Sequence, residues 1–500
     1  MRWPYHRWFL ILVCLLGLLL GGMIGSGRVR SYDVWWHLQL GRDILRTGQI
    51  ALYDEYSHTA SGHFRPPQQW LFEVGQAVVY TIGQERALVG LRMILAALAL
   101  GLLAALLIYR KSSYLLTVVG LVLVAAVSMP NLTCRPHLMI PLLLLALLSL
   151  LESSARRPWL RWLVPLLFVL WANLHASFTL GLAIVGFWMV DRALGSRPRL
   201  AEGLRFSAAG LLEGGALLLA CLAACIINPV RLKLLLYSLD YLPGGAHAWA
   251  TRVVQEWQAP TLASFDMTAT ALVLIGGALV VLLRVRRVSL FELLVAGLMV
   301  MMGLRWGRAA MPAAIMVAWV ALPLLSEWLG QLSPALLGYR FDTGATPHRI
   351  LPLAAVVIAL VGVISISRPV LAKRALNENL FPVVAVEWLE THDLRGNMYN
   401  TYHWGGYLIH RLYPRHRVFI DGRVDMYGKE VFKDWLTIRE TRTGWERVAE
   451  SYDVQWGIVE PDVPLATVVQ GKGNWAAVYR DAQAIVFVNR KGPNARWLKP

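Results

Sequence analysis

Residues 10–47 read LILVCLLGLLLGGMIGSGRVRSYDVWWHLQLGRDILRT, and the change of pattern within this stretch decides the fold we expect. The apolar run from Leu10 to Ile24 follows Arg2 and Arg7, and no small-residue cleavage site comes after it. It is therefore interpreted as a retained membrane span that starts in the cytoplasm, rather than as a signal peptide.

Beyond the apolar run the pattern becomes that of an amphipathic helix. Trp36, Leu40 and Ile44 recur every four residues, which predicts a helix lying in the membrane interface. The polar side chains that project elsewhere are His37, Arg42, Asp43 and Arg46. A second such helix is expected over 68–80, entered through Pro66 and Pro67. Together the two helices would hold Asp33 at the membrane surface.

The composition of the whole chain agrees with a membrane protein. Of its 500 residues 57% are hydrophobic and only 16% are charged, with a mean hydropathy of +0.50. The net charge of +17 does not indicate a nucleic-acid partner, because basic residues in membrane proteins collect in cytoplasmic loops. Four cysteines form neither a disulfide framework nor zinc-ligand spacing.

Apolar windows long enough to cross a bilayer recur along most of the chain. We count eleven, centred on residues 16, 97, 122, 145, 166, 183, 218, 276, 296, 318 and 358. With the N-terminus inside, every inner loop is basic, as the positive-inside rule requires. The unusual polar residues then face the other side of the membrane.

The last part of the chain has a different character. Residues 368–500 are predicted to form a soluble α/β domain outside the cytoplasm, after a transmembrane domain over 1–367 that includes an amphipathic outer loop at 27–86. The strand-like stretches are 417–421, 456–459, 477–479 and 485–488, and the helical ones are 387–394 and 429–440. The expected fold is mainly α, a bundle of about eleven spans with this α/β domain.

The outer loop resembles that of GT-C glycosyltransferases, which have a catalytic Asp after the first span, an amphipathic helix and a basic-Pro-Pro element. Asp33 and the Arg65-Pro-Pro sequence match, most closely the aminoarabinose and protein mannosyl transferase branch. The family's frequent Asp-Glu pair is absent at Asp33, where Val34 follows, and Asp54-Glu55 offers such a pair later. The resemblance implies that Asp33, or else Asp54 or Glu55, is the catalytic base.

Sugar transfer from a lipid phosphate needs a carboxylate to take the acceptor's proton and cations to bind the phosphate that leaves. Cationic candidates on the outer side are Arg135, His137, Arg231, Lys233, Arg305 and Arg308. The alternative for each is contact with phospholipid headgroups. If the turn after residue 305 stays helical, Arg305 and Arg308 share a face and converge on one phosphate.

Other polar residues on the outer side are candidates for acceptor binding or for structural roles. Asn173 and His175 lie in a tight turn between two spans, and Glu256 lies in a long loop, where acceptor binding or part of a metal site is the functional alternative to a solvated acid.

Trp404 and Asp421 match in placement the soluble domain of oligosaccharyltransferase catalytic subunits. The Asp of that family's Trp-Trp-Asp-Tyr-Gly motif is Gly405 here, so the resemblance does not extend to sequon reading. Residues 130–137 also lack the Asp-x-Asp pair of those metal-dependent enzymes. We therefore expect no cofactor and no metal ligands, and a bound divalent cation is the less favoured alternative.

The function expected from these features is transfer of a sugar from a polyprenyl-phosphate donor to a glycan, lipid or protein acceptor on the extracytoplasmic face. The expected location is the bacterial inner membrane, among membrane lipids. Two alternatives stay open. One is a transporter or flippase of lipid-linked substrates, which would show paired broken helices in two halves. The other is a non-catalytic relative of the enzyme fold that acts as a scaffold.

Overall fold

The computed structural model describes residues 4–194, 200, 203–241, 244–259, 265–332, 375–471 and 473–498. The chain divides into two compact units. The helical unit comprises Met1–Arg28, Glu85–Ser238 and Thr251–Ala375. The mixed unit comprises Val29–Gln84, Leu239–Ala250 and Leu376–Pro500, so the segment after α1 and the C-terminal region belong to one compact body.

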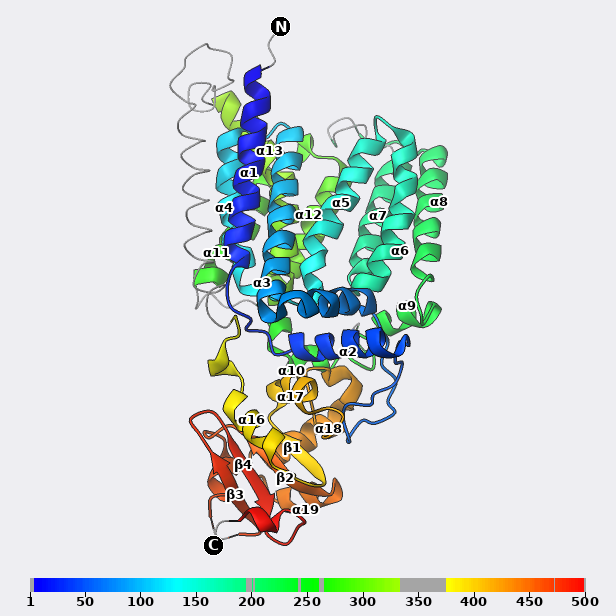
Figure 1. Ribbon diagram of the computed structural model, residues 1–500. Helices are drawn as coiled ribbons and strands as arrows, with labels where there is room; N and C mark the ends of the chain where they lie inside the picture. The colour runs from blue at the N-terminus through cyan, green and yellow to red at the C-terminus, as the bar shows by residue number, and fades with distance from the viewer. Residues whose placement is uncertain are drawn as a thin grey trace. The chain divides into compact units, whose positions relative to one another are not determined.

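The helical unit is a bundle of long apolar helices (Figure 1). They are α1 (Pro4–Gly25), the later part of α3 (Trp70–Tyr109), α4 (Tyr114–Ser128), α5 (Ile140–Ser154), α6 (Val164–Leu174), α7 (Phe178–Leu194), α8 (Ala208–Cys225), α11 (Phe265–Leu283), α12 (Leu290–Arg305) and α13 (Ala310–Leu332). Shorter helices are α9 (Leu232–Leu239) and α10 (Ala250–Val253). Each predicted apolar window falls on a helix except the one centred on residue 358, which lies outside the described residues.

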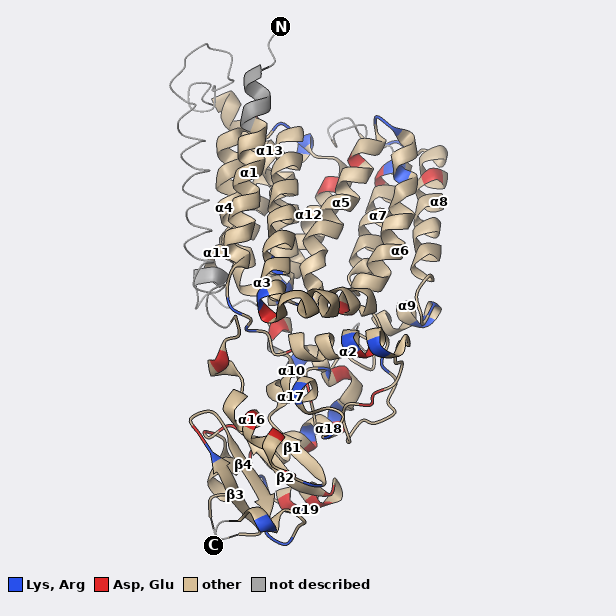
Figure 2. Ribbon diagram, viewed as in Figure 1, with Lys and Arg blue, Asp and Glu red and all other residues tan. Residues whose placement is uncertain are grey.

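The bundle has the length and composition of a membrane domain, and the chain is an integral membrane protein. Five of its described helical segments are long and apolar enough to cross a bilayer: 70–109, 114–131, 136–154, 208–225 and 307–332. Shorter apolar helices cover 10–25, 158–174 and 268–283. Figure 2 shows few charged residues along these helices and more of them near helix ends, as the cost of placing charge in hydrocarbon requires.

Small residues allow the first helix to pack closely. A Cβ atom at Gly21 of α1 would lie 2.3 Å from the carbonyl oxygen of Ala96, and one at Gly17 would lie 2.8 Å from that of Leu100. Both contacts are with the backbone of α3, so α1 approaches it as only glycine allows. The central helix is α13, where 78% of the membrane-length window is buried.

The mixed unit begins with α2 (Val34–Thr47) and the first part of α3, which is broken at Gly83 and Gln84. Its four-stranded sheet has the order β1-β2-β4-β3, formed by β1 (Asn397–Asn400), β2 (Val454–Val459), β3 (Trp475–Arg480) and β4 (Ile485–Asn489). β1 and β2 are parallel, and the other pairs are antiparallel.

Helices complete the mixed unit around the sheet. They are α16 (Val383–Thr391), α17 (Gly405–Leu412), α18 (Val424–Arg439), α19 (Trp445–Ser451) and α20 (Pro464–Val468). The buried core includes Phe419, Trp435, Val459 and Phe487. The apolar residues of β2 and β4 therefore pack against those of α18, and a sheet this small gains the helical cover it needs.

One predicted strand is wrong. Residues 417–421 are extended, but their only strand-like pairing among the described residues is a single parallel bridge between Val418 and Ser57 of the outer loop. The short apolar run of Val418, Phe419 and Ile420 predicted a sheet strand. All three residues are buried, and an extended segment in the core requires the same kind of run.

Candidate active site

Asp33 lies immediately before α2 in the mixed unit, and its side chain is partly exposed. The helix forms as the sequence predicts, with Trp36 and Leu40 buried and Leu45 and Arg46 exposed. Gly48 ends it in the left-handed conformation, with its N–H donating to the Ile44 carbonyl. The first turn of an amphipathic helix therefore presents the carboxylate.

The orientation of α2 is fixed by a close contact with the first part of α3. A Cβ atom at Gly41 would lie 2.0 Å from the carbonyl oxygen of Glu73. The backbones of α2 and α3 are therefore in contact at Gly41 and Glu73. The His37 Nδ1 and Glu73 Oε1 atoms are hydrogen-bonded at 2.9 Å, and both side chains are buried. A buried carboxylate–imidazole pair with the correct geometry allows little variation in the crossing of two helices.

The turn formed by Asp421, Gly422 and Arg423 lies against the Asp33 carboxylate. A Cβ atom at Gly422 would lie 2.1 Å from Asp33 Oδ1 and 3.1 Å from its Cγ. Since real Cβ atoms do not approach so closely, only glycine fits beside this carboxylate. Gly422, from the C-terminal region, therefore packs directly against the Asp33 carboxylate within the mixed unit.

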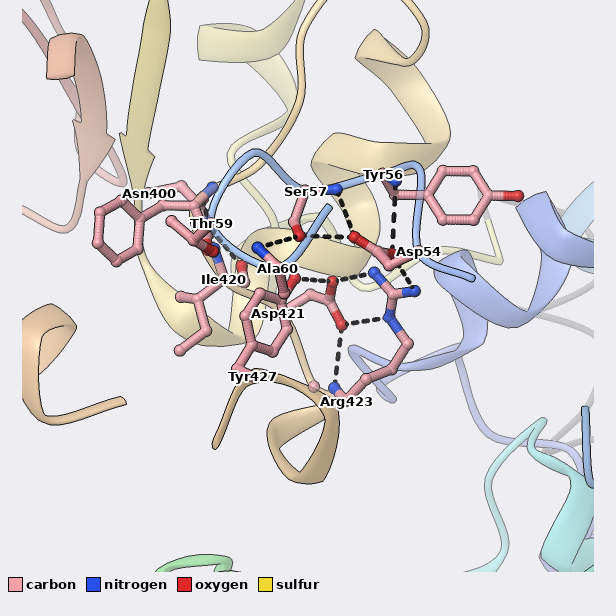
Figure 3. Close-up of polar contacts among 12 residues, drawn as sticks. Asp54, Tyr56, Ser57, Thr59, Ala60, Asn400, Ile420, Asp421, Arg423 and Tyr427 are labelled. Atoms are coloured by element: carbon pink, nitrogen blue, oxygen red, sulfur yellow. Dashed lines mark hydrogen bonds and ion pairs between the residues drawn. The ribbon is translucent and has the colours of Figure 1, made fainter. Parts of the chain in front are cut away.

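A buried ionic network holds this turn in place (Figure 3). The Arg423 guanidinium donates from Nε to Asp421 Oδ1 at 2.8 Å and from Nη1 to Asp54 Oδ1 at 2.7 Å. The Tyr427 hydroxyl donates to Asp421 Oδ2 at 2.5 Å. Burial alone would raise the pKa of Asp421, but the adjacent Arg423 guanidinium outweighs it and holds this pKa below its usual value.

The three candidate carboxylates occupy different environments. Asp54 is 2% exposed, and its second oxygen accepts from the Ser57 N–H at 2.9 Å and the Ser57 hydroxyl at 2.6 Å. Glu55 is exposed, with the Tyr413 hydroxyl 3.5 Å from its Oε2. Both oxygens of Asp54 therefore accept hydrogen bonds within the ionic network. Asp33 differs from the other two carboxylates because it is partly exposed and its position is limited by Gly422.

The two C-terminal candidates are interior residues. Trp404 is 3% exposed and donates its indole N–H to the Leu380 carbonyl at 3.1 Å. Asp421 is fully buried in the network with Arg423. Both have structural contacts, and neither presents a surface to an acceptor.

In the helical unit, three loops that carry predicted site residues converge. Arg135 Nη1 donates to Glu256 Oε1 at 2.5 Å. The Arg308 guanidinium lies over the ring of Trp257, 4.4 Å from its centroid. The Gly307 N–H donates to the Gln258 carbonyl at 2.9 Å. Arg135 and Arg308, two of the predicted phosphate-binding arginines, therefore contact the same short segment, residues 256–258.

The other cations predicted for the phosphate are placed differently. Nε2 of His137 lies 2.7 Å from the Asn131 carbonyl, a hydrogen bond within its own loop. Arg305 is exposed at the end of α12, and Trp306 after it is extended, with φ −136° and ψ 119°. The turn does not stay helical, so the prediction that Arg305 and Arg308 share a helical face is wrong. Arg231 and Lys233 are exposed.

Asn173 connects the end of α6 to the loop after α8. Its amide donates to the Val169 and Ile227 carbonyls, each at 2.8 Å, and its oxygen accepts from Asn228 at 3.1 Å. His175 Nδ1 accepts from the Ser177 N–H at 3.0 Å. These groups satisfy the backbone of a turn, as polar residues near the ends of membrane helices commonly do.

Several site residues were not predicted from the sequence. Gly422, Arg423 and Tyr427 follow the segment 417–421. Gly422 lies beside Asp33 and Arg423 binds Asp54, both in the N-terminal part of the chain, whereas Tyr427 binds the nearby Asp421. Within the described ranges, no group of three or more His, Cys, Asp and Glu side chains is arranged to hold a metal ion.

A domain of apolar helices combined with a small mixed α/β domain is the architecture of the GT-C fold. No protein-family model matches the sequence, and neither does any curated protein.

Solved structures, in contrast, match over most of the chain. The oligosaccharyltransferase AglB from Archaeoglobus fulgidus, in complex with an inhibitory peptide and a dolichol-phosphate, aligns with a TM-score of 0.59 at 13% identity over 92% of this chain and 70% of its own. ArnT from Cupriavidus metallidurans aligns with a TM-score of 0.56 at 12% identity over 99% of both chains. Both are GT-C membrane glycosyltransferases, and this chain has their fold.

Proposed function

We propose that the chain is a membrane glycosyltransferase that moves a sugar from a polyprenyl-phosphate carrier to an acceptor on the extracytoplasmic face. The observation that carries this proposal is the Asp33 carboxylate, which is partly exposed at the start of α2 and bounded by Gly422 in a GT-C fold. AglB, which has this fold, was solved with a dolichol-phosphate, which supports a lipid-phosphate donor here.

In this proposal Asp33 is the general base. It takes the proton of the acceptor as the acceptor attacks the anomeric carbon, and the bond from that carbon to the carrier's phosphate breaks. The leaving phosphate needs cations rather than an acid, because it already bears negative charge, and arginine can hold it with paired hydrogen bonds. Arg135 and Arg308 are assigned this role.

The acceptor's class and the sugar are proposed only in general terms. A glycan, a lipid or a protein segment would each be reached from the extracytoplasmic face of a bacterial inner membrane, with the N-terminus in the cytoplasm. The basic inner loops support this orientation.

The proposal is tested by incubating the purified chain, in lipid nanodiscs, with a panel of polyprenyl-phosphate sugars and extracts of envelope acceptors. We expect release of the polyprenyl phosphate that depends on the acceptor and is lost in Asp33→Asn. Movement of intact lipid-linked sugar across a vesicle membrane without release would instead identify a flippase, and no turnover with any donor would favour a scaffold.

A further inference from the structure

Three consecutive residues of the helical unit contact the arginines and the loop beside them, and we call residues 256–258 the covering segment. Glu256 accepts from Arg135 Nη1 at 2.5 Å, and the Trp257 ring lies 4.4 Å under the Arg308 guanidinium. The Gln258 carbonyl accepts from the Gly307 N–H at 2.9 Å. Arg135 and Arg308, the two arginines assigned to the donor phosphate, are therefore both in contact with the covering segment.

The carboxylate of Glu256 provides the negative charge at this position. Burial by itself would raise the pKa of Glu256, but the Arg135 and Arg308 guanidinium groups outweigh it and lower this pKa to about 2. Glu256 is thus ionised at neutral pH. It neutralises part of the charge that would otherwise attract a phosphate.

A phosphate could take the place of the Glu256 carboxylate on Arg135. The Arg135 side chain is 16% exposed and that of Glu256 is 44% exposed. Because water reaches the Glu256 carboxylate, this group can be hydrated when it leaves Arg135 and is not left buried and unpaired. A phosphate offers more acceptor oxygens than a carboxylate and can hydrogen-bond two guanidinium groups at once.

We propose that Glu256 is an internal counter-ion that the donor's phosphate replaces on Arg135, so that donor binding releases the covering segment from both arginines. This inference rests on the proposed function and adds a residue that sets donor affinity. It makes an unusual prediction, because removing an acidic residue that contacts the site should strengthen binding rather than weaken it.

The test measures binding of a polyprenyl phosphate to the full chain in phosphatidylcholine nanodiscs. Glu256→Gln and Glu256→Ala are expected to bind it about three- to fivefold more tightly than the wild type, and fivefold corresponds to about 1 kcal/mol. Arg135→Ala should bind it more weakly. Glu327→Gln is the matched control, because Glu327 is 35% exposed and forms ion pairs with Arg284 and Arg287, outside the covering segment.

Separate titrations with phosphatidylglycerol distinguish a carrier site from a general headgroup site. We expect the Glu256 variants to gain affinity for polyprenyl phosphate, with no competition from phosphatidylglycerol. Equal competition by phosphatidylglycerol would overturn the assignment to the donor. If the wild type binds polyprenyl phosphate and both Glu256 variants bind it equally well or more weakly than the wild type, this inference alone is overturned. Wild-type protein that does not bind at all would overturn the proposed function as well.

Discussion

At the scale of single residues, burial separates carboxylates that look equivalent in the sequence. Asp33, Asp54 and Glu55 lie within 23 positions, and the Asp54-Glu55 pair matches the family pattern better than Asp33-Val34 does. Asp54 is nevertheless bound by Arg423, which is 369 positions away. No local pattern reveals such a partner, so the sequence alone could name the candidates but could not choose among them.

The glycine beside Asp33 provides a prediction at this scale. Gly422→Ala is expected to lower the turnover number about 100-fold with little change in donor binding, because a methyl group 2.1 Å from Asp33 Oδ1 must displace the carboxylate. Gly473→Ala is the control, since nothing lies within 4 Å of a Cβ atom there. Steady-state kinetics and donor titrations measure the two effects. Unchanged turnover in Gly422→Ala would show that the position of Asp33 is not critical.

His410 gives the mixed unit a predictable response to acid. Burial, together with the Arg42 and Arg411 charges, lowers the pKa of His410 to about 3, and Arg42 Nη1 lies 3.3 Å from its Nδ1. The unfolded chain takes up this proton near pH 6.5, so between these two pKa values the unfolded state binds more protons and stability falls as the pH falls.

The expected loss from His410 between pH 7.5 and pH 5 is about 2 kcal/mol of unfolding free energy. Chemical unfolding of the purified chain at a series of pH values measures this loss. His410→Gln should make the pH dependence shallower over this range. An identical pH dependence in wild type and His410→Gln would mean that other groups are responsible.

At the scale of elements, the periodic segments were predicted well and the connections were not. The amphipathic helix predicted from Trp36, Leu40 and Ile44 is observed as α2, and the strands at 456–459, 477–479 and 485–488 are observed within β2, β3 and β4. The position of α2 in the membrane interface stays a prediction. Their apolar periodicity depends only on nearby residues. The extended Trp306, which ends α12, depends on contacts of Gly307 with Gln258 and Asn131, and these are not readable from local sequence.

The crossing of α2 and α3 supports a second substitution experiment. Gly41→Ala is expected to reduce both folding yield and activity, because its methyl group would lie 2.0 Å from the Glu73 carbonyl oxygen, a backbone atom that cannot move alone. Gly75→Ala, in the first part of α3, meets nothing within 4 Å and should be neutral or stabilising by up to about 1 kcal/mol. Melting temperatures of the two variants decide the point. Equal stability would show that the two helices have room to separate.

At the scale of the whole molecule, charge patterning and hydropathy predicted the class of fold, a helical membrane bundle with a small α/β domain. They did not predict that residues 29–84 and 376–500 form one compact unit. That association depends on contacts such as Thr59 Oγ1 donating to the Phe419 carbonyl, between segments with no shared pattern. The domain limits at 367 and 368 stay a prediction, since these residues are not described.

Independence from divalent metal is a prediction about the enzyme as a whole. Transfer should continue in EDTA at nearly its full rate, because arginines are proposed to stabilise the leaving phosphate in place of a cation. The measurement compares the initial rates before and after chelation, and after manganese or magnesium is added back. Loss of activity that either metal restores would contradict the prediction, and Asp33, Asp54 and Glu256 would then be the ligands to test.

The most direct test of the central claim is the single-turnover rate of sugar transfer from a preformed complex of the protein with its donor, in wild type and in Asp33→Asn. The substitution keeps the volume of the side chain but removes the base, so the rate should fall about 100- to 10,000-fold. Donor affinity and melting temperature should stay unchanged, and Glu55→Gln should transfer normally. A near wild-type rate in Asp33→Asn would contradict the account and move the search for the base to Asp54 or Glu55.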